Sequence, residues 1–126
     1  MRAVDTNVLV RLVAPDDERQ FAKAAEFVER GAWASHVVLT ELSWVLRASY
    51  GFDHAAIVAA LQMLLNQQDL TVQDPDVVAA ALEHYRRKPV LGFADCLILE
   101  IARKAGHLPL GTFDKALGKL DGAQRL

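Results

Sequence analysis

The chain has 126 residues, is 52% hydrophobic and carries 14 Lys and Arg against 16 Asp and Glu, a formal net charge of −2. This length predicts one domain with a sizeable core, the apolar runs are too short to cross a bilayer, and no overall basic excess marks a nonspecific nucleic-acid binder. The chain does not open with a basic leader followed by an apolar stretch, and its single cysteine, Cys96, excludes an internal disulfide. We therefore expect a cytoplasmic protein without membrane association.

Short apolar segments alternate with segments of helical periodicity along the chain. We expect strands at residues 2–5, 32–35, 70–72 and 108–111, and an edge strand at 123–126. Helices are expected from residue 7 and at residues 16–30, 37–50, 53–67, 75–88, 93–105 and 113–117. This alternation predicts an α/β fold: a single domain over residues 1–126, with a parallel sheet of four or five strands and helices on both faces.

Two carboxylates are expected where strands end. Asp5 follows the apolar Ala3 and Val4 of the first strand, and Asp114 comes directly after the fourth strand. In open parallel sheets, ligands bind at the carboxyl ends of the strands. We expect Asp5 and Asp114 to share that edge with Asp95, in the first turn of helix 93–105.

Glu41 breaks the polarity pattern of helix 37–50. On a helical wheel it lies away from the polar face, on the side that carries Val38 and Leu42. No basic residue stands three or four positions away to pair with it. The sequence thus predicts a carboxylate turned toward the interior.

Asp95 breaks the pattern of helix 93–105 in the same way. It lies among Ile98 and Leu99, opposite a face that we assign to solvent and that carries Glu100, Arg103 and Lys104. An unpaired buried carboxylate tends to take up a proton, so four converging acids require cations between them.

Oxygen ligands without His or Cys favour Mg²⁺, with Mn²⁺ as an alternative, over zinc. Such an ion is usually completed by substrate phosphate, which indicates hydrolysis of phosphodiester bonds. Thr6, Asn7 and Thr112 are candidates to orient the acids or the phosphate.

Three of these acids have an ordinary structural alternative. Asp5 is a plausible helix N-cap, Asp114 a first-turn acid behind a Thr112 cap, and Asp95 likewise an acid near the start of its helix. Beside the other acids, Asp5 is better interpreted as part of a metal site, which leaves the capping role to Asn7 or Thr6.

Four motifs then stand in order: DTN at Asp5, VVLTELSWVL around Glu41, GFADCLI around Asp95 and TFDKAL around Asp114. Together they resemble the PIN-domain nucleases and, within these, the VapC toxins of bacterial toxin–antitoxin pairs, over nearly the whole chain. The resemblance implies a metal-dependent endoribonuclease, usually a homodimer, that a cognate VapB-type antitoxin inhibits. It assigns the acidic site to Asp5, Glu41, Asp95 and Asp114, with Asp5 and Asp95 in direct contact with Mg²⁺.

Two details qualify the resemblance. Thr112 matches the small hydroxyl residue that often precedes the last acid. Many relatives carry a further acid where this chain has Gly92, so the chain lacks one acid that would help to hold a second metal ion. Setting the four site acids aside leaves twelve acids against 14 bases. The net charge then no longer opposes an RNA substrate.

Two other classes are consistent with parts of the sequence. A receiver-like signalling domain shares the length and the α/β alternation, but needs an acceptor Asp at the end of a central strand, whereas Asp53 is expected to open a helix. A catalytically silent protein-binding module would use helix 53–67, where Ile57, Leu61 and Leu64 form either a docking surface for a second copy or an antitoxin, or part of the core.

Overall fold

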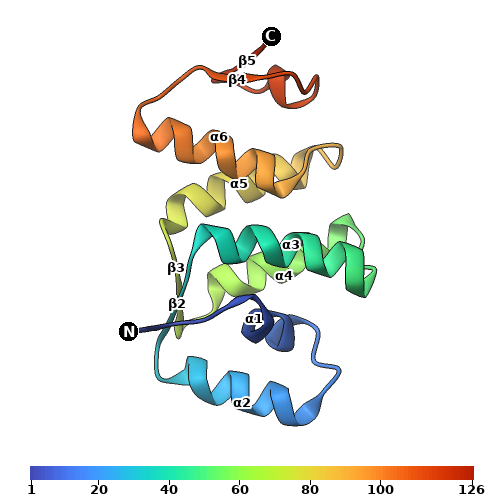
Figure 1. The fold of residues 1–126 in the computed structure, drawn as a ribbon, viewed down its shortest axis with the longest axis vertical. Coiled ribbons are helices and arrows are strands. Elements are labelled where there is room, and N and C mark those ends of the chain that lie inside the picture. Colours follow the sequence, from blue (N-terminus) through green and yellow to red (C-terminus); the bar gives the residue numbers. More distant parts are fainter. The chain divides into compact units, whose positions relative to one another are not determined.

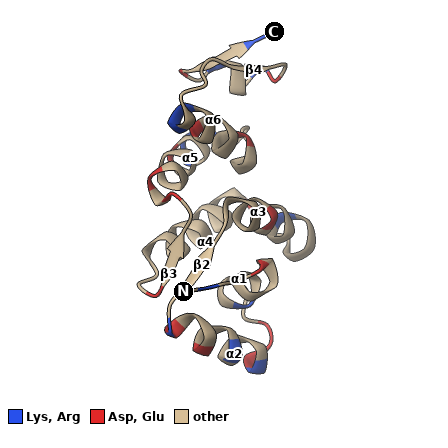
Figure 2. Ribbon diagram, turned by 60° about the vertical axis from the view of Figure 1, so that its left-hand side comes forward, with Lys and Arg blue, Asp and Glu red and all other residues tan.

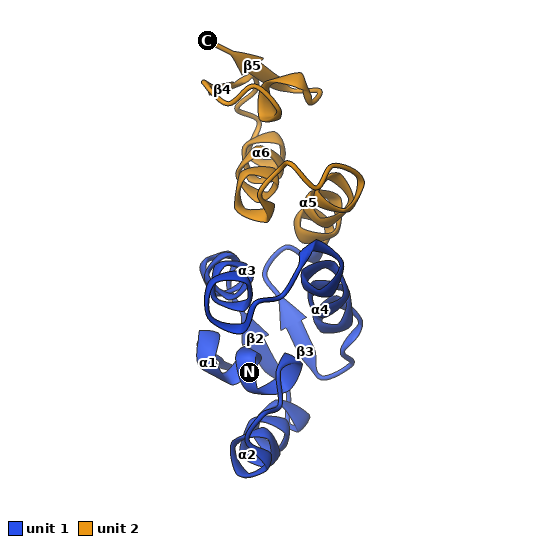
Figure 3. Cartoon of the chain, turned by 90° about the vertical axis from the view of Figure 1, so that its right-hand side faces the viewer, with its two compact units in different colours: residues 1–75 blue, residues 76–126 orange.

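The computed structural model describes residues 1–126, every residue of the sequence. The chain forms two compact units, unit 1 (Met1–Pro75) and unit 2 (Asp76–Leu126), which are coloured separately in Figure 3.

Unit 1 contains three strands and four helices (Figure 1). Its elements are β1 (Arg2–Ala3), α1 (Thr6–Val13), α2 (Glu18–Glu29), β2 (Ala32–Ala34), α3 (His36–Tyr50), α4 (His54–Asn66) and β3 (Leu70–Val72). The three strands pair in parallel in the order β1-β2-β3. Helix α1 packs against α2 and α3, and α3 packs against α4.

Local capping sets the helix ends of unit 1. The start of α4 and the end of α3 lie where the sequence predicts them, whereas α2 begins at Glu18 and not at residue 16, because Asp17 is its N-cap. The side chain of Asp17 accepts a hydrogen bond from the backbone of Gln20 at the start of α2, and Asp53 accepts one from Ala56 at the start of α4. Helix α3 ends at Gly51, whose φ of 65° is a conformation that glycine adopts at little cost. Because Asp53 caps a helix, it does not stand at the end of a central strand, where a receiver-like domain needs its acceptor Asp.

The apolar face of α4 belongs to the core of unit 1. Ile57, Leu61 and Leu64 are each only 1% exposed. The alternative in which these three residues form a docking surface is therefore wrong, because packing inside unit 1 already removes them from solvent.

Unit 2 contains α5 (Pro75–Arg87, which begins at the boundary), α6 (Phe93–Ala105), β4 (Leu110–Thr112), the short 3₁₀ helix η1 (Leu117–Lys119) and β5 (Ala123–Arg125). The rings of Tyr85 and Phe93 meet edge to face, with centroids 6.2 Å apart. Strands β4 and β5 pair in parallel, so the predicted edge strand is confirmed.

Two predicted boundaries in unit 2 are wrong. The fourth strand begins at Leu110 and not at residue 108, because Pro109 has no N–H to donate to a ladder. The helix expected at residues 113–117 is absent, and η1 stands at Leu117–Lys119 instead. A single turn of α-helix is too short to be stable alone, and Asp114 takes up the amide of Leu117.

The α/β class, with parallel strand pairing and five strands, is confirmed, but the strands form a three-stranded and a two-stranded sheet. Strands of two or three residues make few hydrogen bonds. Strand β4 pairs with β5, because closing the short segment between them costs little entropy. None of the helices has the length and apolar character that a membrane span requires.

Candidate functional site: four acids and a buried ion-pair network

Asp5 is the N-cap of α1. Its exposed carboxylate accepts a hydrogen bond from the backbone N–H of Val8 at 3.3 Å. The assignment of the cap to Asn7 or Thr6 is therefore wrong, since Thr6 is already the first helical residue and is 8% exposed. Only one oxygen of Asp5 takes the amide, so the cap leaves the second oxygen available to a ligand.

Glu41 is exposed, contrary to the prediction that it faces the interior. The buried side of α3 carries Leu39, Leu42 and Leu46, and the neighbours of Glu41 on the open side include Trp44, which is 67% exposed. Helix α3 is apolar around most of its circumference, so the wheel alone does not identify the buried arc. Packing against α1 and α4 selects it.

Asp95 lies in the first turn of α6 and is half-buried. Burial raises the pKa of Asp95, and the nearby carboxylate of Asp114 raises it further. The structure thus brings together one pair of the four predicted site acids, and this pair lies within unit 2.

Asp114 follows β4 in a tight local frame. Its own N–H donates to the hydroxyl of Thr112 at 3.0 Å, and its carboxylate accepts from the N–H of Leu117 at 2.7 Å. Thr112 therefore orients Asp114 through the backbone. The alternative in which Asp114 is a first-turn acid behind a Thr112 cap is wrong, because no helix begins at residue 113 and Asp114 itself accepts from Leu117. As in Asp5, one carboxylate oxygen remains for a ligand.

Asp5 and Glu41 belong to unit 1, and no three His, Cys, Asp or Glu side chains are grouped in the structure so as to hold a metal ion. The convergence of all four acids stays a prediction. Charged residues of both signs are spread over the helices (Figure 2), and unit 2 carries more basic than acidic residues.

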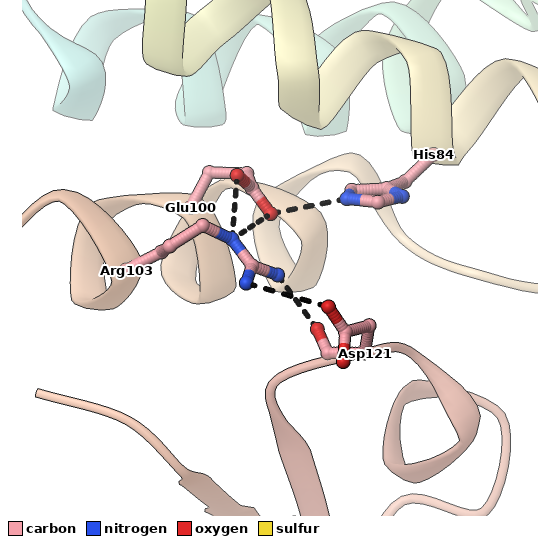
Figure 4. A network of polar contacts seen from close by, with 4 residues as sticks. All are labelled: His84, Glu100, Arg103 and Asp121. Atoms are coloured by element: carbon pink, nitrogen blue, oxygen red, sulfur yellow. Dashed lines mark hydrogen bonds and ion pairs between the residues drawn. The ribbon is translucent and has the colours of Figure 1, made fainter.

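A buried polar network in unit 2 was not expected. Glu100, predicted to face solvent, is only 7% exposed and makes ion pairs with His84 of α5 and with Arg103. Arg103 in turn reaches Asp121 (Figure 4). The spacing of Glu100 and Arg103, three residues apart on α6, is compatible with their pairing, but nothing in the sequence signals His84 and Asp121, which come from other elements.

Three comparisons place the chain among known proteins. The PIN domain family model matches residues 2–123. Among solved structures, the chain is similar to Mycobacterium tuberculosis VapC20, described as a toxin that cleaves the sarcin-ricin loop, with 23% identity over 94% of this chain and 93% of that one and a TM-score of 0.44. No curated protein gives a significant match. Because the family match runs through both units and all four acidic motifs, the chain belongs to the PIN domain family.

Proposed function

We propose that the chain is a metal-dependent endoribonuclease that hydrolyses RNA phosphodiester bonds. The observation that carries the proposal is the pair Asp95 and Asp114: the nearby carboxylate of Asp114 adds to burial in raising the pKa of the half-buried Asp95. A cation between them would relieve this repulsion. The donor set of carboxylate oxygens fits Mg²⁺ or Mn²⁺.

In this proposal Asp95 and Asp114 would hold the metal, and the motif resemblance assigns Asp5 and Glu41 to the same acidic set. When bound, such an ion would supply Lewis acidity and an activated water for phosphodiester hydrolysis. Two residues of the chain are candidates to orient the acids or the phosphate. Thr112 fixes the backbone of Asp114. Asn7 is exposed in the first turn of α1, beside Asp5.

The test is cleavage of a mixed RNA substrate by the purified chain. We expect cleavage with Mg²⁺ or Mn²⁺, none with EDTA, and none by Asp95→Asn. Glu83→Gln serves as the matched control, because Glu83 is an exposed acid of the same unit that pairs only with Arg86 and Arg87. Full activity of Asp95→Asn, or cleavage in EDTA, would contradict the proposal.

We further propose that the chain acts as the toxin of a type II toxin–antitoxin pair, as a cytoplasmic homodimer bound by a VapB-type antitoxin, and that both units form one domain. The support is the family match across both units and exposed apolar surface in unit 1, where Leu12, Phe21 and Met63 line a cavity of about 480 Å³. Such surface is typical of protein interaction sites. Sedimentation over a range of concentrations tests the dimer, and co-expression with the product of a neighbouring small reading frame tests the antitoxin.

A further inference from the structure

We propose that Arg103 is a positioning residue that holds Asp114 beside Asp95, by docking the segment from β4 to β5 onto α6. The inference rests on the metal site of the proposed function. It concerns a residue that lies outside all four acidic motifs.

Asp114 belongs to a segment that packs mainly on itself. β4 pairs with β5, and η1 contacts both strands. Helix α6, which carries Asp95, has no comparably extensive contact with any of these three elements. Individual side-chain contacts between α6 and this segment therefore help to set the place of Asp114 relative to Asp95.

Arg103 connects α6 to this segment (Figure 4). Its Nη2 donates to the backbone carbonyl of Asp121 at 2.6 Å, and its Nη1 lies 3.9 Å from the Asp121 carboxylate. The neighbouring Gly122 carbonyl accepts from the N–H of Leu110, the first residue of β4, at 2.8 Å. Fixing residue 121 therefore also fixes β4, the strand that leads directly to Asp114.

The other end of the guanidinium is fixed inside unit 2. Its Nε donates to both carboxylate oxygens of Glu100, at 3.2 and 3.3 Å, and Glu100 also meets Nε2 of His84 at 3.0 Å. Because Glu100 is buried, movement of Arg103 would leave a charge poorly compensated. Arginine can bridge the two partners at once because its donors form a rigid planar fork.

Gly122 provides the space for this contact. Its φ is 92°, and a Cβ at this position would lie 3.0 Å from Nη2 and 3.1 Å from Nη1 of Arg103. A side chain there would be strained and would push the guanidinium from the turn. Arg103→Ala and Gly122→Ala are therefore two independent ways to undo the same docking, and the second retains both charges of the ion pair.

The first experiment measures Mn²⁺ binding by calorimetry in the absence of RNA, together with amide hydrogen exchange of the segment. We expect Arg103→Ala and Gly122→Ala to bind Mn²⁺ about 10- to 100-fold more weakly than the wild type, the range found for residues that orient metal ligands. Exchange at Leu110 should become faster. Arg87→Ala is the matched control, because it removes an exposed ion pair with Glu83 in the same unit and should change neither.

The second experiment separates positioning from a general loss of structure. In Gly122→Ala, the Mg²⁺ concentration for half-maximal cleavage should rise by the same factor, while the rate at saturating Mg²⁺ stays near that of the wild type. Asp95→Asn should not recover at any Mg²⁺ concentration.

The outcomes distinguish the positioning role of Arg103 from the proposed function. Mn²⁺ affinity equal to the wild type in both variants, with faster exchange at Leu110, overturns the positioning role and leaves the proposed function standing. Absence of Mn²⁺ binding by the wild type overturns both. If Arg103→Ala does not fold, Gly122→Ala alone decides the question.

Discussion

Asp114 acts on Asp95 through space: after the burial of Asp95 itself, the carboxylate of Asp114 is the main cause of the raised pKa of Asp95. This relationship disfavours the ionised form of Asp95 in the free protein, since the half-buried carboxyl group of Asp95 lies near a second negative charge. Such a pair is typical of a site that binds a cation. It separates these two acids from Glu83, which two arginines neutralise and whose pKa falls to about 2.

Lowering the pH should relieve this repulsion. A carboxyl group with a raised pKa in the folded state takes up its proton before the unfolded chain does, so its penalty is present above the raised pKa and disappears as the pH falls toward the ordinary value of 3.8. We expect Asp95→Asn to be more stable than the wild type at neutral pH, and the difference to shrink in acid. Urea titrations of both proteins across this range measure it. A difference that grows in acid would contradict the assignment.

Addition of Mg²⁺ at neutral pH should raise the thermal midpoint of the wild type, because a ligand that binds only the folded state stabilises it. The midpoint of Asp95→Asn should not respond. Calorimetric scans with and without Mg²⁺, each repeated in EDTA, provide the comparison.

Substitution of Asp5 separates capping from catalysis. Asparagine is as good an N-cap as aspartate, whereas alanine removes the hydrogen bond to Val8 and should cost about 1 kcal/mol. We expect Asp5→Asn to be as stable as the wild type and Asp5→Ala to be less stable by this amount, while both variants lose RNA cleavage. Wild-type cleavage by Asp5→Asn would reduce Asp5 to a structural cap.

Glu41→Gln should leave stability unchanged within about 0.5 kcal/mol, because Glu41 is exposed on α3. A loss of cleavage in this variant is then a functional effect. Thermal unfolding and a cleavage assay on the same sample measure the two quantities, and Glu29→Gln, an exposed acid at the end of α2, is the control.

Glu100 should matter for stability more than any exposed acid of unit 2. Glu100→Ala removes the hydrogen bonds that Arg103 and His84 make to one buried carboxylate, and the loss of hydrogen bonds to a charged group should cost about 2 kcal/mol. Glu83→Ala breaks only exposed pairs and should have no measurable effect. Denaturant titrations of both variants test the contrast, and equal stabilities would show that the network is not structurally important.

Gly92→Asp tests the departure from the resemblance to PIN-domain nucleases. Gly92 is the N-cap of α6 with φ −87° and ψ 145°, makes no side-chain cap, and would place a Cβ 3.7 Å from Oδ2 of Asp95. An aspartate fits this backbone and would add a carboxylate beside Asp95, whose repulsion opposes the gain of about a few tenths of a kcal/mol from capping in the free protein. We expect tighter Mn²⁺ binding, which calorimetry measures. Unchanged affinity would mean that the added carboxylate does not reach the ion.

The local features of this protein follow from the sequence. The cap at Asp53 and the glycine end of α3 at Gly51 depend on contacts within one helical turn, so neighbouring residues in the chain suffice to predict them. The order of the four acidic motifs identifies the family for the same reason, since each motif is a short local pattern.

The tertiary structure decided which of several apolar faces is buried and which charges meet. Glu41 is exposed and Glu100 is buried, the reverse of the helical-wheel prediction, because helices with wide apolar arcs are oriented by the elements packed on them. Likewise, the division of the strands into two sheets and the contacts of Arg103 with Glu100 and Asp121 join residues far apart in sequence. Such contacts contribute to stability only in the folded chain, so the linear pattern of residues does not predict them.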